Sequence, residues 1–279
     1  MIDFYLYRTK FFLPRQTNIF GDNELKRENI LQNILKEKPS IELREGHNWH
    51  IGNVHRIDDA GGYFAVGRTT KSILEKYDKQ SGNFVEEQLE TSPYTHVIFD
   101  RAIGFLAIAK KTKLALSATG IASKLSKLFR ASDFIIHNKI DVSLDPISDP
   151  YDFIDAVKTA YSIRSFEVTF TKSNPFDADE YFQKPMEKYL DAARGEKGKT
   201  AISGRDLDSD TLARVTQSVA ATGNDAKASL KVSQSAHYST KRLRGNPAYF
   251  PIAEEEFSHE AALDEARHTY AKVRDKSNA

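Results

Sequence analysis

The sequence contains no cysteine among its 279 residues. This absence excludes disulfide bonds, thiolate zinc sites, iron–sulfur clusters and a cysteine nucleophile. Long hydrophobic runs are missing too, because charged residues interrupt every apolar stretch before the roughly 20 residues that a membrane-spanning helix needs. The N-terminus has no basic segment followed by an apolar one, so a secretion signal is not predicted. We therefore expect a cytoplasmic protein with no membrane partner.

Acidic residues are missing from two long windows, although the chain as a whole is almost neutral. The totals are 40 Lys and Arg against 39 Asp and Glu, which gives a net charge of +1. Residues 101–132 hold seven basic and no acidic residues, and residues 226–253 hold five basic and no acidic residues. Residues 133–192 compensate with a net charge of −6, and residues 254–279 with −3. The near-neutral total therefore conceals two basic segments.

These acid-free windows favour a nucleic-acid-binding protein, because lysine and arginine side chains displace the counterions that surround phosphates. The predicted phosphate contacts are Lys110, Lys111, Lys113, Lys124, Lys127 and Arg130 in the first window, and Lys241, Arg242 and Arg244 in the second. The second group follows His237 and Tyr238 in a polar segment that suits phosphate and base-stacking contacts. The pattern does not distinguish DNA from RNA.

The apolar pattern predicts an α+β fold in two parts. Residues 47–109 alternate with a period of two between glycine and proline breaks, which predicts an antiparallel β-meander of four to six strands. An apolar stripe over 121–129 predicts a basic helix, so that residues 1–132 form a β-rich N-terminal domain. Residues 133–253 alternate strand and helix, as in a ferredoxin-like (split βαβ) domain. Residues 254–279 are expected to form a charged helix and tail.

The remaining elements are predicted from caps, breakers and apolar spacing. Asn23 and Asp177 are expected to cap helices, and Pro185 is expected to kink the second of these. The predicted helices cover residues 24–37, 150–161, 177–194 and 209–222, and the predicted strands cover residues 1–12, 134–140, 166–170, 230–232 and 249–252.

Three histidines fall within nine residues, at His47, His50 and His55. Three imidazoles are enough for a zinc site, but alternation along one strand turns His50 away from the other two. We therefore favour histidines on the faces of a sheet, with no metal and no other cofactor. The alternative is a metal-independent nuclease in which His50, His55 or His237 acts as acid or base beside a cation. The sequence does not decide whether the protein is an enzyme.

Two further motifs are expected to be structural. Residues 193–200 read A-x-x-x-x-G-K-T, which resembles a phosphate-binding loop, but they follow a predicted helix where the motif requires a buried strand. The alternating acids of residues 206–210 lack the glycine and the glutamate of a calcium loop, and they favour a helix N-terminus instead. A last alternative is an assembly subunit whose basic and acidic surfaces pair between copies or with a partner protein.

Overall fold

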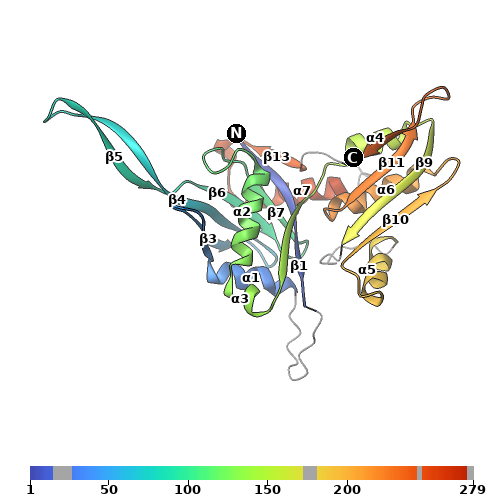
Figure 1. Cartoon of the computed structure of the whole chain (residues 1–279), viewed down its shortest axis with the longest axis horizontal. Coiled ribbons are helices and arrows are strands. Elements are labelled where there is room, and N and C mark those ends of the chain that lie inside the picture. Colours follow the sequence, from blue (N-terminus) through green and yellow to red (C-terminus); the bar gives the residue numbers. More distant parts are fainter. Residues whose placement is uncertain (15–26, 172–180, 244–246, 275–279) are drawn as a thin grey trace, which may run out of the picture.

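The computed structural model describes residues 1–14, 27–171, 181–243 and 247–274. Over these residues the chain forms seven α-helices and 13 strands, which are arranged in two antiparallel sheets (Figure 1). The predicted α+β fold is confirmed. Within the described residues, no helix is both long enough and apolar enough to cross a membrane. The predicted caps at Asn23 and Asp177 lie outside the described residues.

The larger sheet has nine strands, ordered β13-β1-β7-β6-β4-β3-β2, with β8 also on β1 and β5 also on β4. We call it the large sheet. Its strands are β1 (Ile2–Phe12), β2 (Ser40–Arg44), β3 (His47–Arg56), β4 (Gly61–Asp78), β5 (Asn83–Thr91), β6 (Tyr94–Asp100), β7 (Phe105–Ala109), β8 (Asp141–Pro146) and β13 (Tyr249–Ile252). The predicted meander over 47–109 is present as β3 to β7. Both β8 and β13, from the second part of the chain, pair with β1.

Three helices cover one face of the large sheet: α1 (Arg27–Glu37), α2 (Ala118–Arg130) and α3 (Asp133–His137). The predicted helix over the 121–129 stripe is present as α2, which begins after Ser117, whose Oγ accepts a hydrogen bond from the backbone N–H of Gly120 at 3.1 Å. The strand predicted over 134–140 is wrong, because this segment forms α3 and a turn. The Glu37 carboxylate accepts a hydrogen bond from the Phe134 N–H at 3.0 Å and so caps α3 from a distant segment.

The smaller sheet has four strands, ordered β10-β9-β11-β12. We call it the small sheet. Its strands are β9 (Ser162–Thr171), β10 (Lys197–Ser203), β11 (Asp225–Lys231) and β12 (Ser239–Arg242). Antiparallel β9 lies between β10 and β11, and helix α6 (Ser209–Ala221) connects these two parallel strands. This is the predicted split βαβ arrangement. Asp208 caps α6, and Gly223 ends it in a left-handed conformation with φ of +60°.

The remaining helices lie between the two sheets. They are α4 (Tyr151–Lys158), α5 (Gln183–Ala192) beside β10, and α7 (His259–Arg274), which follows a 3₁₀ turn over Glu254–Glu256. Pro185 lies in the first turn of α5, where a proline is tolerated, so it does not kink the middle of a helix. One apolar core joins the second face of the large sheet, these helices and the inner face of the small sheet. The outer face of the small sheet is therefore at the surface of the molecule.

An arginine fixes α7 to the large sheet. The Arg267 guanidinium lies 2.7 Å from the Asp58 carboxylate and 2.7 Å from the Asp100 carboxylate. Asp58 and Asp100 also accept backbone hydrogen bonds in the turns that follow β3 and β6. The hydrogen bond from Arg267 holds the pKa of Asp58 well below its usual range. One side chain thus connects a helix to two turns of the sheet.

A second cation connects the two sheets. Lys10 on β1 is only 1% exposed, and its Nζ lies 2.9 Å from Asp145 Oδ2 on β8. The same ammonium donates to Thr171 Oγ1 at the end of β9 and to the carbonyl of Gly223 and the amide oxygen of Asn224, in the turn after α6, at 3.0–3.2 Å. Burial lowers the pKa of Lys10, and the charge of Asp145 opposes that shift. Lys10 therefore joins β1 to the small sheet through a satisfied buried charge.

We expect Lys10→Met to lower the free energy of unfolding by about 3 kcal/mol, because it leaves Asp145 and three other acceptors without their donor. Urea denaturation measures this loss, and Lys158→Met, at an exposed site on α4, should change stability by less than about 0.5 kcal/mol. Lys10→Met/Asp145→Asn should recover part of the loss. A loss no larger than that of Lys158→Met would contradict this role.

Candidate nucleic-acid interface

The outer face of the small sheet, which we call the open face, is polar and cationic. Side chains on β9 and β11 alternate between the buried inner face and the open face. From Ser165 to Thr171 and from Asp225 to Ser229, every side chain on the open face is at least partly exposed. Its charged side chains are Arg164, Lys197, Lys199, Lys227, Lys231, Arg242, Glu167 and Asp225. Six cations against two anions give this face a net charge of +4. The uncharged side chains between them are serine, threonine and alanine.

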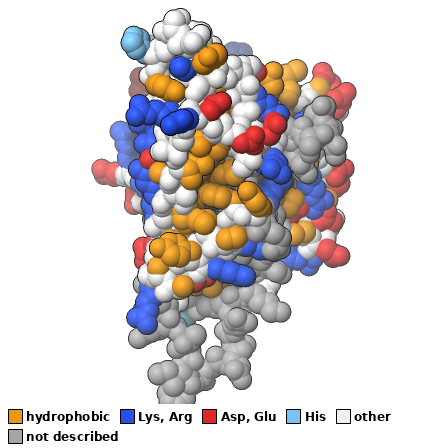
Figure 2. Space-filling view, turned by 90° about the vertical axis from the view of Figure 1, so that its right-hand side faces the viewer, with side chains coloured by type: hydrophobic (Ala, Val, Ile, Leu, Met, Phe, Trp, Pro, Cys, Tyr) orange, Lys and Arg blue, Asp and Glu red, His pale blue; other side chains and the backbone are white. Residues whose placement is uncertain are grey.

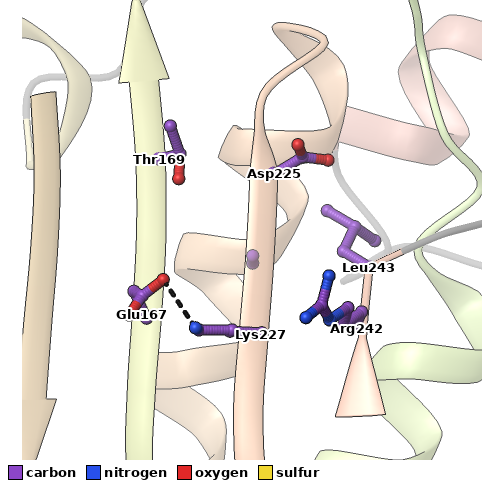
Figure 3. A pocket seen from close by; sticks show the side chains of 7 residues that line it. Glu167, Thr169, Asp225, Lys227, Arg242 and Leu243 are labelled. Atoms are coloured by element: carbon purple, nitrogen blue, oxygen red, sulfur yellow. Dashed lines mark ion pairs between the residues drawn. The ribbon is translucent and has the colours of Figure 1, made fainter. Parts of the chain in front are cut away.

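A row of charges crosses the middle of the open face. Strand pairing places Glu167, Lys227 and Arg242 directly side by side on β9, β11 and β12. Lys199 on the other neighbouring strand, β10, pairs with Thr169 and so lies two residues out of line with Glu167. The Glu167 carboxylate lies 2.7 Å from Lys199 Nζ and 3.0 Å from Lys227 Nζ. Figure 3 shows Glu167, Lys227 and Arg242 at one level, with Thr169 and Asp225 at the next, around a shallow hollow of about 140 Å³.

The pKa of Glu167 is lowered by its hydrogen bonds to Lys199 and Lys227, the bond to Lys199 being the larger cause. The carboxylate stays ionised at neutral pH and neutralises part of the charge of both lysines. An oxyanion of a ligand would meet the same two ammonium groups, with Arg242 as a third donor. The row is therefore chemically suited to a phosphate that competes with Glu167.

Aromatic and cationic groups meet at one end of the open face. Lys231 Nζ lies 5.0 Å from the ring centre of Tyr161 and 5.4 Å from that of Tyr238. The guanidinium of Arg164, the extra residue of a β-bulge in β9, lies 5.8 Å from the Tyr238 ring. Tyr161 is 53% exposed and Tyr238 is 39% exposed, so both rings keep free surface for a further planar group.

Exposed apolar side chains also lie on the edge strand β10 and around α5. Ile202 on β10 is 45% exposed, and Tyr181 before α5 and Tyr189 within it are 73% and 67% exposed. Viewed from the small-sheet end, hydrophobic side chains gather in the middle and Lys and Arg side chains lie beside them (Figure 2). The small-sheet end of the molecule thus carries both exposed apolar side chains and cationic ones.

The second acid-free window contributes only part of its predicted contacts to this face. Arg242 lies on the open face, together with Lys227 and Lys231 from the same window. Lys241 has the opposite orientation on β12 and lines a cleft with Asp149 and Asp152 of the α4 segment. Arg244 lies outside the described residues.

The first acid-free window lies on the other half of the molecule. Its helix, α2, packs on the large sheet, and α2 lies well apart from β9, β10 and β11 of the small sheet in Figure 1. Lys110, Lys113 and Lys127 are exposed, whereas Lys124 is partly covered. Arg130 donates to the carbonyl of Val142 and lies 3.2 Å from the Asp141 carboxylate, so it holds β8. The geometry does not place these residues together with those of the small sheet.

The candidate histidines of the sequence lie at three separate places. Both ring nitrogens of His50 meet hydroxyl groups, Ser40 Oγ at 2.8 Å and Thr69 Oγ1 at 3.1 Å. His55 stacks against Tyr63, and His237 is exposed in the loop between β11 and β12. Among the described residues, no group of three His, Asp or Glu side chains is arranged to hold a metal ion.

A histidine cluster that sequence reasoning missed surrounds Tyr63 on the α7 side of the large sheet. His259 stacks on the Tyr63 ring at 3.7 Å between centres, and His96 lies 5.5 Å from the same ring. Burial lowers the pKa of both His96 and His259. These contacts are ring to ring, which indicates packing of neutral imidazoles and gives no support to the nuclease alternative.

The two motifs expected to be structural lie in regular secondary structure or at a helix cap. Gly198, Lys199 and Thr200 lie within β10 and pair with β9, so they do not form a loop that opens a helix. Asp208 accepts a hydrogen bond from the Thr211 N–H at 2.8 Å as the cap of α6. Lys199 therefore belongs to the open face, and its alternation with Lys197 along the chain is the signal that could have shown this.

We expect the Glu167 carboxyl group to titrate below the usual range of a glutamate. Lys199→Ala should raise its pKa toward that range, and Lys227→Ala should raise it by a smaller amount, because the Lys199 hydrogen bond is the larger cause. Carbon-13 NMR titration of the side-chain carboxyl measures both shifts, with Lys158→Ala as a distant control. An unchanged Glu167 pKa in Lys199→Ala would contradict the charge row.

Comparison with known proteins gives no independent indication of function. No protein-family model matches this chain, and no curated protein matches it.

Proposed function

We propose that the protein binds single-stranded nucleic acid on the open face of the small sheet. The observation that carries this proposal is the combination of three cations on β10, β11 and β12 around Glu167 with two exposed tyrosines at one end of the open face. Phosphates bind lysine and arginine through charge, and unpaired bases stack on aromatic rings. A flat sheet face offers both kinds of contact along one extended strand of nucleic acid.

The charge distribution supports a polyanion more than a small anionic ligand. The hollow at the charge row holds only about 140 Å³ and is lined mostly by charged and polar side chains, whereas sites for small molecules are larger and mostly apolar. The cations lie along the whole width of the sheet, from Lys197 and Lys199 at one edge to Arg242 at the other. Successive phosphates of one strand could contact successive sheet positions, with Glu167 displaced from its two lysines.

Replacing three cations of the row should reduce the salt dependence of binding. For Lys199→Ala/Lys227→Ala/Arg242→Ala, we expect the slope of log K against log salt to fall by about 2, since each phosphate contact to a single strand contributes about 0.7. Fluorescence anisotropy with labelled single-stranded RNA, single-stranded DNA and duplex DNA at several salt concentrations measures this slope.

The matched control is Lys110→Ala/Lys124→Ala/Lys127→Ala in the first acid-free window, which should leave the slope unchanged. If only this control lowers the salt dependence of binding, the nucleic-acid interface lies in residues 101–132 instead. Wild-type protein that binds none of the three nucleic acids at low salt would remove the proposal altogether.

The tyrosines should contribute affinity without contributing salt dependence. Tyr161→Ala/Tyr238→Ala is expected to weaken binding to single strands by about tenfold, because stacking of one base contributes about 1–3 kcal/mol. Tyr161→Phe/Tyr238→Phe keeps both rings and should keep most of the affinity. The same anisotropy titrations measure these changes, and equal losses in the alanine and phenylalanine variants would contradict stacking.

A further inference from the structure

A two-stranded arm extends from the large sheet. Among the described strands, β4 pairs only with β5 from Thr70 to Asp78, whereas its residues 62–67 lie between β3 and β6. The arm, residues 70–91, is about 30 Å long at the usual rise of a strand, and Figure 1 shows it pointing away from the rest of the molecule. A hairpin of two strands without a core is marginally stable in water.

The arm exposes apolar side chains on both of its faces. Ile73, Tyr77 and Phe84 share one face and are 61%, 55% and 84% exposed, and Tyr77 contacts Phe84 edge to face at 5.3 Å. Leu74 and Leu89 on the other face are 49% and 39% exposed. Exposed apolar side chains concentrated on one projecting element mark a surface that binds a partner.

The charge of the arm limits which partner fits. Its aromatic face also carries Lys71, Glu75, Glu86 and Glu90, a net charge of −2. Glu75 and Glu86 lie directly opposite one another, and such like-charged pairs are stabilised when a cation approaches them. This negative charge disfavours nucleic acid and anionic lipid, and it favours a surface that combines apolar and basic groups.

Such a surface lies at the root of the same arm. Tyr94 and Leu116 there are 45% and 89% exposed. Lys111 Nζ lies 5.1 Å from the Tyr94 ring, and the carbonyl of Lys113 accepts a hydrogen bond from Arg68 of β4. We call these four residues, Tyr94, Lys111, Lys113 and Leu116, the arm base. Because the arm points away from its own base, the two surfaces cannot meet within one chain.

We propose that two copies of this chain exchange their arms, so that the aromatic face of each arm packs on the arm base of the other copy. The two surfaces match in chemistry, apolar and acidic against apolar and basic. A reciprocal exchange buries both pairs of surfaces in one symmetric dimer. The proposal does not depend on nucleic-acid binding, because the arm and the open face belong to different sheets.

Sedimentation velocity at micromolar concentrations tests the dimer with the full chain. Wild type should sediment as a dimer, and Tyr77→Glu/Phe84→Glu should sediment as a monomer with an unchanged cooperative unfolding transition of the body. Tyr189→Glu/Val232→Glu, which adds the same charge at exposed apolar sites away from the arm, should stay dimeric. A monomeric wild type, or a dimer that survives the arm substitutions, would overturn the proposal.

Reversing the charges of the arm and of the arm base tests whether these two surfaces contact each other in the dimer. Glu86→Lys/Glu90→Lys in the arm and Lys111→Glu/Lys113→Glu in the arm base should each be monomeric alone, because like charges then face each other. An equimolar mixture of the two variants should form a heterodimer, since both contacts regain opposite charges. The assignment of these lysines would be overturned if the mixture fails to associate. It would also be overturned if Lys111→Glu/Lys113→Glu stays dimeric and loses nucleic-acid binding.

Discussion

The buried ammonium of Lys10 is the contact on which the relation between the two sheets depends. A charge removed from water must be met by several oxygens at hydrogen-bond distance, and here they come from β8, from β9 and from the turn after α6. The small sheet can therefore dock on β1 in only one way without leaving the charge unsatisfied. Apolar packing around α6 and α7 has no such directional requirement, so it supplies stability more than orientation.

That orientation determines which surface is free. Helices and sheets alternate through the molecule, from α1–α3 to the large sheet, then α4, α6 and α7, then the small sheet. Because α4 and α6 occupy the inner face, the hydrophilic positions of β9 and β11 point outward. The lysines around Glu167 are thus held on strand backbones instead of mobile loops, which fixes their spacing. A regular spacing of cations suits a ligand with regularly spaced charges.

Local signals in the sequence predict individual helices and strands. The remaining features of the structure depend on contacts between segments that are distant in the sequence. Apolar periodicity and caps are sufficient for α2 and α6, whereas α3 receives its cap from Glu37, at the end of the distant helix α1. Counting charges by window identified the segment of Arg242 but could not show that Lys241 faces the other side of β12, because alternation along a strand decides that. Lys199 was missed because it lies outside both acid-free windows and meets Glu167 only through the pairing of β10 with β9.

The arm can open and close without unfolding of the body. Its backbone hydrogen bonds join β4 to β5, and they do not depend on the packing that stabilises the body. Backbone amides of the arm should then exchange with solvent far faster than those of β6 or β7, since opening the hairpin does not require global unfolding. In the proposed dimer, the arm would gain its remaining contacts only when a second copy binds, so the stability of the arm would depend on protein concentration.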